Sequence, residues 1–337
     1  MSRDNPSHSI PSYRLKVNGR NITPTLNGRL ISLSLTDNGG NEADQLDITL
    51  DDHDGKLAIP PNGATLQLWL ADANGHLVDK GTFTADEISH DGAPDTLTIR
   101  ARSADFRGSL KQKREQGWDQ NTLAEILTTL AKRNGLEPLI SDEIGPTLIE
   151  HIDQTNESDI SFLTRLAHQH DALASVKAGH LLLMPRGQSR SISGKPIPTL
   201  SLSRQHGDQH SYSLEDRDSL YSGVKARWND TATAQVQTVA VGDASKAKLL
   251  RQVFASAEQA TNEAKAEWQR LQRQGAQFTL TLATGNPAIY PETPVKLSGW
   301  KPQIDETDWL LTQVVHSLGN GGYTTRLEME TRPAGSA

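Results

Sequence analysis

The residues with the most obvious chemical potential are acidic and lie together in one short segment. The run Asp51-Asp52-His53-Asp54-Gly55 resembles half of a calcium-binding loop, in which spaced carboxylates precede the glycine of a sharp turn. The bidentate glutamate that completes such a loop does not stand at the required position. A solvated turn between two strands therefore explains this segment better than a metal site does.

Two histidine pairs were the next candidates for a metal site, and their spacing argues against both. His168 and His170 are two residues apart on a predicted helix, so their side chains diverge by about 200°. His206 and His210 have the i, i+4 spacing that suits a shared metal on a helix, but Gly207 between them indicates a loop. Cysteine is absent, which excludes disulfides and thiolate ligands.

Motifs for phosphate binding and for catalysis also fail. Gly194-Lys195 is followed by Pro196, where a phosphate-binding loop needs Ser or Thr, and Ser189 stands where the first glycine belongs. Neither G-x-S-x-G nor H-E-x-x-H occurs. Paired carboxylates for glycoside cleavage stay open, because their spacing is spatial rather than sequential. We therefore expect no catalytic, cofactor-binding or metal-binding residues, and no cofactor.

The composition favours several thin elements over one large core. A chain of 337 residues is long enough to divide into two or three domains. Hydrophobic residues make up 35% and aromatic residues 5%, which implies a large surface. The 26 glycines and 16 prolines are spread along the chain, and frequent turns are typical of a mainly β protein.

Charge and hydropathy limit the partners. The net charge is −7, the isoelectric point is near 5.9, and no long basic block occurs, so we expect no sequence-specific nucleic-acid binding. The longest aliphatic run, Leu181 to Met184, is far shorter than the ~20 residues of a membrane span. The N-terminus has no apolar stretch of the kind found in signal peptides. We expect a soluble protein made in a cytoplasm, with no membrane partner.

Residues 13 to about 105 alternate apolar and polar side chains with period two, as strands with one buried face do. The inward positions are Tyr13, Leu15, Val17, Ile31, Leu33, Leu35, Leu46, Ile48, Leu50, Leu66, Leu68, Leu70, Leu97, Ile99 and Ala101. Asn18-Gly19 and Asn74-Gly75 are hairpin signals. This many alternating segments predict a sheet that is closed or folded as a barrel.

A helical middle follows. Thr122 to Glu125 fits a capping box, an apolar stripe runs from Leu123 to Ala131, and Asn134-Gly135 supplies the stop. A second helix is predicted to begin near Asn156 or Ser158. Both apolar stripes are narrow, so each helix must pack on another element.

Strand patterns return from about residue 180 and enclose a helical excursion. Ser256 and Gln259 open that helix and Gly275 ends it, with an alanine-rich face that lets its axis approach a sheet closely. The chain ends in a predicted hairpin through Gly319 to Gly322, whose arms are residues 310–315 and 323–329. The second half is therefore also expected to be mainly β.

Residues 154–167, with the sequence QTNESDISFLTRLA, resemble a motif of contractile-tail hubs: bacteriophage late control protein D, R-type pyocin hubs and the hub portion of type VI secretion spike proteins. The motif begins a helix, with acidic residues placed favourably at its N-terminus. Further segments fit the same family: Trp118-Asp119 with the helix that follows, Asp52 to Gly63, and the closing hairpin with Trp309, Val315-His316 and Gly322-Tyr323-Thr324-Thr325. The resemblance runs from about residue 10 to residue 332.

The resemblance implies a mechanical role, that of a structural baseplate hub rather than an enzyme. Such hubs form a homotrimeric ring with two tube-like barrels in each subunit, so that six barrels match a hexameric tail tube while threefold symmetry holds a trimeric spike. The expected fold is mainly β with helical insertions: a tail-tube-like β-barrel domain at 1–108, a helical connector at 109–178, and a second β-barrel domain at 179–337 with a helical insertion at about 244–275.

The same resemblance supplies the expected partners and location. The partners would be the trimeric tail spike protein, the hexameric tail tube protein, baseplate wedge proteins and the tape-measure protein. The chain would assemble in the bacterial cytoplasm and then reside in the baseplate of a phage tail or tailocin particle. The chain stops shortly after the second β region, which implies that the spike is a separate protein.

Two other functions compete with the hub. A cell-envelope carbohydrate-acting enzyme would be favoured by two carboxylates that face each other across a cleft with shifted pKa values. A carbohydrate-binding or host-recognition module would display exposed aromatic side chains, and the chain has few aromatic residues. We rank the hub first, the enzyme second and the recognition module third.

Overall fold

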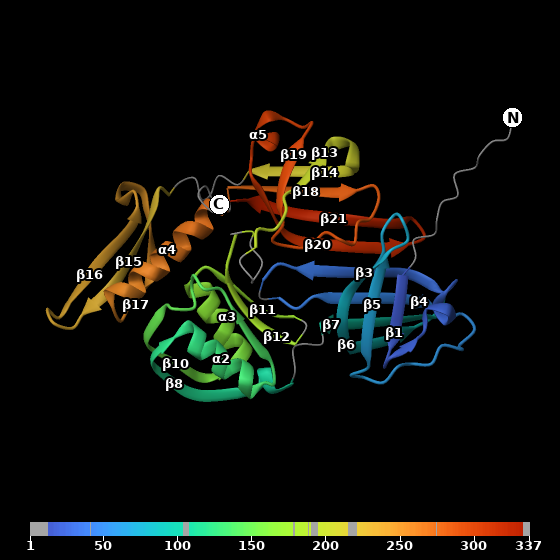
Figure 1. Cartoon of the computed structure of the whole chain (residues 1–337), viewed down its shortest axis with the longest axis horizontal. Coiled ribbons are helices and arrows are strands. Elements are labelled where there is room, and N and C mark those ends of the chain that lie inside the picture. The colour runs from blue at the N-terminus through green and yellow to red at the C-terminus, as the bar shows by residue number, and fades with distance from the viewer. Residues whose placement is uncertain are drawn as a thin grey trace.

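The computed structural model describes residues 13–40, 42–103, 108–177, 179–187, 189, 195–214, 221–273 and 275–332. The fold is mainly β with few helices, which agrees with the predicted fold class at that level. Figure 1 shows one large sheet, a smaller sheet with helix α4 at the opposite end of the molecule, and a third unit containing α2 and α3 between them.

The large sheet has 13 strands and draws on both halves of the chain. Its path runs β14-β18-β21-β20-β3-β4-β7-β6-β5-β1-β2, with β13 and β19 attached beside β20. The early strands are β1 (Tyr13–Val17), β2 (Arg20–Asn21), β3 (Leu30–Asn38), β4 (Gln45–Asp51), β5 (Thr65–Ala71), β6 (Leu77–Asp91) and β7 (Thr96–Ser103). The late strands are β13 (Leu200–Ser203), β14 (Gly207–Leu214), β18 (Ala276–Leu282), β19 (Pro294–Ser298), β20 (Trp309–Gly319) and β21 (Gly322–Thr331). Short helices α1 (Thr23–Leu26), η2 (Arg204–His206) and α5 (Pro302–Asp305) lie between them.

The two β regions are joined through their backbones. Strand β3 pairs antiparallel with β20 over seven positions, from Asn38 opposite Gln313 to Ser32 opposite Gly319. The pairings of the described residues form an open path that ends at β14 and β2, so no closed barrel is detected in either region. The two regions are therefore parts of one continuous sheet, a continuity that the sequence patterns do not indicate.

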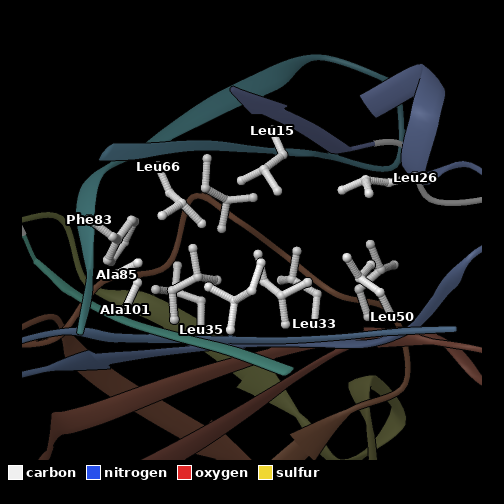
Figure 2. Packing of buried hydrophobic residues seen from close by; sticks show 14 of the residues in the cluster. Leu15, Leu26, Leu33, Leu35, Leu50, Leu66, Phe83, Ala85 and Ala101 are labelled. Carbon is white, nitrogen blue, oxygen red and sulfur yellow. The ribbon is translucent and has the colours of Figure 1, made fainter. Parts of the chain in front are cut away.

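The first core forms where the large sheet bends over itself. Figure 2 shows Leu15 and Leu66 facing Leu33, Leu35 and Leu50 across a dry interior. These are inward positions of the predicted alternation, and all five side chains are buried. Burial of this many leucines supplies the main driving force for this half of the sheet, because each contributes roughly 1.5–3 kcal/mol relative to an exposed side chain.

One predicted inward position is wrong. Ile31 is 39% exposed, because the pairing of β3 with β4 shifts register between Leu30 and Ser32. The hairpin predicted at Asn74-Gly75 forms through residues 72–76 and not through a two-residue turn, because Ala71 pairs with Leu77. At Asn18-Gly19 the prediction is confirmed: β1 and β2 pair from Val17 to Arg20, which leaves Asn18 and Gly19 as a two-residue turn with φ values of 48° and 79°. Positive φ at both positions is what a type I′ hairpin requires.

The middle unit contains the two predicted helices, the strand predicted from residue 180, and four strands that the sequence patterns do not predict. Helix α2 (Leu123–Arg133) has the full capping box between Thr122 and Glu125, and α3 (Asp159–Gln169) is capped by the Ser158 hydroxyl. The strands are β8 (Lys113–Thr122), β9 (Glu137–Ile140), β10 (Leu148–Ser158), β11 (Ala172–Lys177) and β12 (His180–Pro185), and the 3-10 helix η1 (Gly108–Lys111) precedes them. The unit has its own apolar core, built mostly from α2, α3, β11 and β12.

The small sheet consists of β15 (Gly223–Asp230), β16 (Gln235–Gly242) and β17 (Ala247–Phe254), and α4 (Ala257–Arg273) covers one of its faces. The predicted helical insertion at about 244–275 is wrong in its first part, because residues 247–254 form a strand after the 3-10 helix η3 (Ala244–Lys246). The helix begins where its cap was predicted: the Gln259 N–H donates to the Ser256 hydroxyl. The division of the chain at residues 108 and 178 stays a prediction.

Candidate assembly surfaces and the joints behind them

The resemblance motif surrounds a buried carboxylate. Asp159 begins α3, and its side chain accepts hydrogen bonds from the Asn134 side chain at 2.8 Å and from the Gln154 side chain at 2.9 Å. Arg133 lies 3.3 Å from the same carboxylate and Arg114 lies 3.5 Å away. A buried carboxylate is tolerated when it is paired and fully hydrogen-bonded, as here. Asp159 thus ties α3 to α2, β8 and β10.

Aromatic packing joins the same segments on the apolar side. The rings of Trp118 on β8 and Phe162 on α3 are stacked with centroids 5.8 Å apart. The Arg133 guanidinium lies 5.6 Å from the centre of the Trp118 ring, which adds a cation–π contact. The two separate sequence segments that resemble the hub family, around Trp118 and around Asp159, are therefore in direct contact. Their role in the fold is structural.

The closing hairpin holds another buried polar group. The Nδ1 atom of His316 is hydrogen-bonded to the Tyr323 hydroxyl at 2.9 Å and to the Thr325 hydroxyl at 3.1 Å. Burial, assisted by the positive charge of Lys80, lowers the pKa of His316 to about 3, so the ring is neutral at physiological pH. Burial also raises the pKa of Tyr323. This motif likewise stabilises the sheet and does not present a reactive group.

A charged joint connects the large sheet to the middle unit. Asp37 on β3 lies 3.2 Å from the Lys177 amine on β11 and 3.5 Å from Lys80 on β6, and Asp44 lies 3.5 Å from Lys177. Burial raises the pKa of Asp44 to about 6, although Lys177 opposes that shift. Burial disfavours the charged form of Lys177, but the two carboxylates outweigh it and raise its pKa. The joint is a four-membered ion network in which Asp37, Asp44 and Lys80 are largely shielded from solvent and the Lys177 side chain is partly exposed.

A second charged joint fixes α4 to the rest of the molecule. Arg273, near the end of α4, makes a bidentate pair with Asp171 at the end of α3, and both residues are buried. Arg273 also lies 3.6 Å from Glu330 on β21. Glu292 lies in the same region. Its side chain accepts a hydrogen bond from the Gly187 N–H at 3.3 Å, and the charges of Arg186, Glu330 and Arg273 influence its pKa.

Glu292 is the most perturbed carboxyl of this joint. Its side chain retains some solvent exposure but is densely surrounded by protein atoms, and the resulting desolvation raises its pKa to about 7. The positive charge of Arg186 and the Gly187 N–H oppose the shift without cancelling it. Burial also raises the pKa of Glu330.

The exposed face of the large sheet is polar across both β regions. One row of paired residues crosses six neighbouring strands, β21-β20-β3-β4-β7-β6: Thr324, Ser317, Ser34, Asp47, Arg100 and Glu87. The next row crosses eight strands and has one apolar member: Gln209, Thr281, Arg326, Val315, Thr36, Gln45, Arg102 and Thr84. We call these two rows the polar face.

Each arginine of the polar face has a carboxylate beside it. Arg100 lies 3.0 Å from Glu87 and 3.6 Å from Asp47, Arg102 lies 3.1 Å from Asp86, and Arg326 lies 3.0 Å from Glu328. A hollow of about 350 Å³ opens on the β4-β7-β6 part of this face. A sheet face this large without an apolar patch is suited to contact with water rather than to packing against another sheet.

The first sequence candidate for a metal site, Asp51 to Gly55, forms a turn in which each carboxylate has a protein partner. Asp54 pairs with Arg29 at 2.7 Å, Asp51 accepts from the His53 N–H at 3.0 Å, and Asp52 accepts from the Leu57 N–H at 2.9 Å. The prediction of a turn is confirmed, but the turn is not fully solvated, because Asp52 is buried.

The histidine candidates are dispersed. His168 contacts Arg270 of α4, and His170 follows α3, where burial lowers its pKa. His206 closes the short turn before β14 through the Ser203 N–H at 3.0 Å, and the loop predicted between His206 and His210 is wrong, because strand β14 begins at Gly207. The His210 ring makes a tilted contact with Phe278 and an edge contact with Trp300. Within the part of the chain that the structure describes, no group of three or more His, Asp or Glu side chains is arranged to hold a metal ion.

The remaining glycine candidates are Gly194 and the glycines of the closing hairpin. Gly194 lies outside the described residues. The glycines of the closing hairpin lie where the sequence placed them, with Gly319 opposite Gly322 and a φ of 95° at Gly322. No helix among the described residues is long and apolar enough to cross a membrane.

A cleft of about 210 Å³ separates β10 from the beginning of α4. Glu150, Glu258 and Glu263 line it, together with Leu148, which is 44% exposed. Burial raises the pKa of Glu263, while a hydrogen bond from Gln169 opposes the shift. This cleft between two units is the type of place where the competing enzyme hypothesis would locate its carboxylates.

Sequence reasoning missed the two charged joints. Asp37 does carry a detectable signal, since it continues the inward parity of Leu33 and Leu35 and is therefore a charge at a core position. Asp171 and Arg273 carry none, because their 102-residue separation conceals the contact. The polar face was implicit in the outward positions of each predicted strand, but its continuity across β3 and β20 was not.

The comparison with known sequences gives a consistent result. The model of the family described as phage tail baseplate hub (GPD) matches residues 44–322. The chain is 43% identical to the probable baseplate hub protein of Escherichia phage 186 and 42% identical to that of Escherichia phage P2. Both alignments cover 98% of this chain and 96% of the relative.

Solved structures share the fold at much lower identity. The tail protein from Neisseria meningitidis MC58 has a TM-score of 0.71 at 16% identity, with 95% of this chain and 96% of that chain covered. A component of the type VI secretion system of E. coli has a TM-score of 0.54 at 14% identity, with 95% and 79% covered. These structures support the fold, and the close relatives confirm the resemblance noted at residues 154–167. The chain belongs to the phage tail baseplate hub (GPD) family.

Proposed function

We propose that this baseplate hub protein forms a homotrimeric ring that adapts a trimeric tail spike to a hexameric tail tube. The role of the family is structural and not enzymatic. Each subunit would contribute two tube-like β units, so that three subunits present six similar surfaces above and a true threefold surface below. Such a ring needs heterologous contacts that close after three steps.

The observation that carries the proposal is the backbone pairing of β3 with β20. Because seven consecutive residue pairs join the two β regions, they cannot rotate independently, and a subunit offers both to its neighbours in one fixed geometry. An adaptor between a sixfold tube and a threefold spike requires that kind of rigidity. The charged joints at Asp37 and Asp171 brace the other units against the same sheet.

The polar face supports the orientation that we assign to the ring. We place it toward the central channel, because it spans both β regions, lacks an apolar patch and carries charges that are already paired. A channel wall must stay wetted and must not bind the cargo that passes along it. The outward surfaces would then be left for baseplate wedge proteins, and the channel for the tape-measure protein.

The test begins with an affinity-tagged chain expressed in cells that produce the particle. Mass spectrometry and electron microscopy of the eluate should recover tube, spike and sheath proteins on rod-shaped particles, either phage tails or tailocins. The purified chain should have three times its mass of 36.8 kDa by mass photometry, and its complex with the spike should have that mass plus the mass of the trimeric spike. A free monomer without tail components would contradict the proposal and would direct attention to the carboxylates of the β10–α4 cleft.

A further inference from the structure

The two free edges of the small sheet are protected very differently. Strand β17 carries Lys248 and Arg251, and its pairing with β15 is interrupted by a register shift. Strand β16 has the sequence QVQTVAVG, without charge or proline, and pairs with β15 at eight consecutive positions without a shift. Charges, prolines and bulges are the usual devices that prevent an edge from pairing with another chain. Edge β17 has charges and a register shift, whereas edge β16 has no charge, no proline and no shift.

The exposure of β16 strengthens this contrast. Six of its eight residues are exposed and none is buried. Val236 is 55% exposed, and on the same outer face of the sheet Leu249 is 50% exposed and Val253 is 38% exposed. Exposed β-branched residues along an unprotected edge are what strand addition by a second polypeptide would cover. Figure 1 shows that this sheet lies at the end of the molecule farthest from β1 and β5, where a partner meets no obstruction from the large sheet.

The outer face has a basic centre. Lys225 lies between Ala240 of β16 and Leu249 of β17, and Arg227 lies between Thr238 and Val253. Among the described residues, neither basic side chain has an ion pair within 4.0 Å, and the Arg227 Nε is buried without a hydrogen-bond partner. The nearest carboxylate on the same strand, Asp230, is engaged by its own turn through Thr233. Two basic groups without an ion pair among the described residues, in a protein with a net charge of −7, would be complemented by an acidic partner.

We propose that β16 accepts an added strand from another protein of the tail particle, an extended segment of about eight residues with Asp or Glu at its outward positions. An added strand would lie about 10 Å from β15, within reach of the long side chains of Lys225 and Arg227. Backbone pairing would supply most of the affinity, and the two basic groups would select the acidic segment. The free edges of the large sheet, β2, β13 and β14, contain one acidic residue among them, Asp208, so these edges of a second copy of this chain are a poor match. The proposal rests on the hub function.

Hydrogen exchange tests the pairing directly. Amide exchange at residues 235–242 would be compared between the purified chain and intact particles, with residues 247–254 as the internal control. Pairing should slow alternate amides of β16 by about tenfold or more, and those of β17 by less than about twofold. Equal exchange of β16 in both samples would overturn the inference. Absence of the chain from the particles, read from their protein content, would instead overturn the hub function.

A matched pair of variants tests the chemistry. Thr238→Glu places a negative charge beside Arg227 on the β16 edge and should repel an acidic strand. Gln252→Glu makes the same change at an exposed position on β17. Both variants should enter particles, but only Thr238→Glu should lose the protection of β16, returning to within about twofold of the free chain. Loss of protection in both, or in neither, would contradict strand addition at β16.

Carbodiimide cross-linking identifies the occupant, because it joins an amine to a carboxylate only where the two are in contact. In intact particles, Lys225 should link to an Asp or Glu in another tail protein, and the Lys225→Gln variant should lose that product. A link from Lys225 to a second copy of this chain would overturn the assignment of the partner. No link at Lys225, with unprotected β16 amides, would overturn the inference as a whole.

Discussion

The large sheet and the small sheet of this hub protein differ in how far their side chains are packed or paired within the chain. In the large sheet, apolar side chains point into cores and the arginines of the polar face have carboxylate partners within 3.6 Å. In the small sheet, α4 covers one face, while the other exposes Val236, Leu249 and Val253 around two basic residues that make no ion pair with another described residue. The large sheet therefore finds its packing and charge partners within the chain, whereas the small sheet is packed only on the face that α4 covers.

This difference indicates which surfaces stabilise the fold and which are suited to bind a partner. A surface whose charges and apolar groups are satisfied internally contributes to the fold, and substitutions there should change the free energy of unfolding. A surface left unsatisfied should tolerate substitution in the isolated chain and respond only in the assembled particle. The predictions below separate these two behaviours.

The largest effect is expected from truncating the core of the large sheet. Phe278 is fully buried and packs against Trp300 and Trp309 at centroid distances of 5.5 and 5.6 Å. Phe278→Ala should lower the free energy of unfolding by about 3–5 kcal/mol, through lost burial and the cavity left behind. Leu249→Ala on the small sheet should cost less than about 0.5 kcal/mol. Urea titration followed by tryptophan fluorescence would measure both, and similar costs would remove the contrast between the sheets.

The attachment of the small sheet should be the next most sensitive point. Asp171→Asn removes the charge that balances the buried Arg273 while keeping a residue that tolerates the φ of 48° at this position. Breaking a buried pair in this way should cost about 3 kcal/mol. Asp119→Asn, in the exposed pair with His151, is the matched control and should cost much less. If both substitutions had the same effect, the joint would not be what fixes α4.

A double variant tests whether the lost stability comes from the unpaired charge of Arg273. Asp171→Leu combined with Arg273→Met removes both charges, and replacing a whole buried pair by apolar groups is often neutral. Recovery of most of the lost stability would show that the single variant suffers from an uncompensated charge. No recovery would mean that the contact itself, and not charge balance, holds the helix end in place.

The pH dependence of the second joint gives a smaller effect with a definite sign. The pKa of Glu292 is raised to about 7, so the protonated form is favoured in the folded state. Its contribution is therefore favourable at low pH and is lost as the pH rises from the unfolded value of 4.5 through about 7. Glu292→Gln should be more stable than the native protein at pH 8, by about 1–3 kcal/mol, with the difference fading toward pH 5.

Thermal unfolding across that pH range would check the prediction. The surrounding charges are Arg186 and Arg273, which oppose the shift, and Glu330, which adds to it. Because burial also raises the pKa of Glu330, the variant should retain part of the pH slope. A variant that is less stable than the native protein at pH 8 would mean that the Glu292 carboxylate is charged and paired with Arg186.

The sequence predicted elements where one side of the backbone is apolar. The leucine alternation of β3, β4, β5 and β7 and the capped helices α2 and α3 are local patterns, and they are confirmed. Strands β8 and β10 were missed because most of their residues are exposed or half-buried, so no period-two pattern marks them. The predicted helical insertion began too early because β17 has apolar residues on both faces, Leu250 and Phe254 toward α4 and Leu249 and Val253 outward, so no period-two alternation marks it as a strand.

Long-range contacts were beyond such reasoning. The pairing of β3 with β20 joins residues such as Leu35 and His316, and neither segment contains a local signal for the other. The same holds for Lys177 with Asp37 across 140 residues. The candidate surfaces depend on those contacts, so the outward residues of each strand were predictable and their assembly into one polar face was not.

The smallest expected effect lies on the polar face itself. Glu87→Gln removes a carboxylate that pairs with Arg100, and both side chains are more than half exposed, at 59% and 53%. An exposed pair contributes little, so Tm should fall by no more than about 2 °C at low salt and by still less at 1 M salt, where charges are screened. Lys225→Gln on the small sheet removes no ion pair with a described residue and should leave Tm unchanged at either salt concentration. A salt-dependent change at Lys225 would reveal an internal partner and would make the small sheet as self-sufficient as the large one.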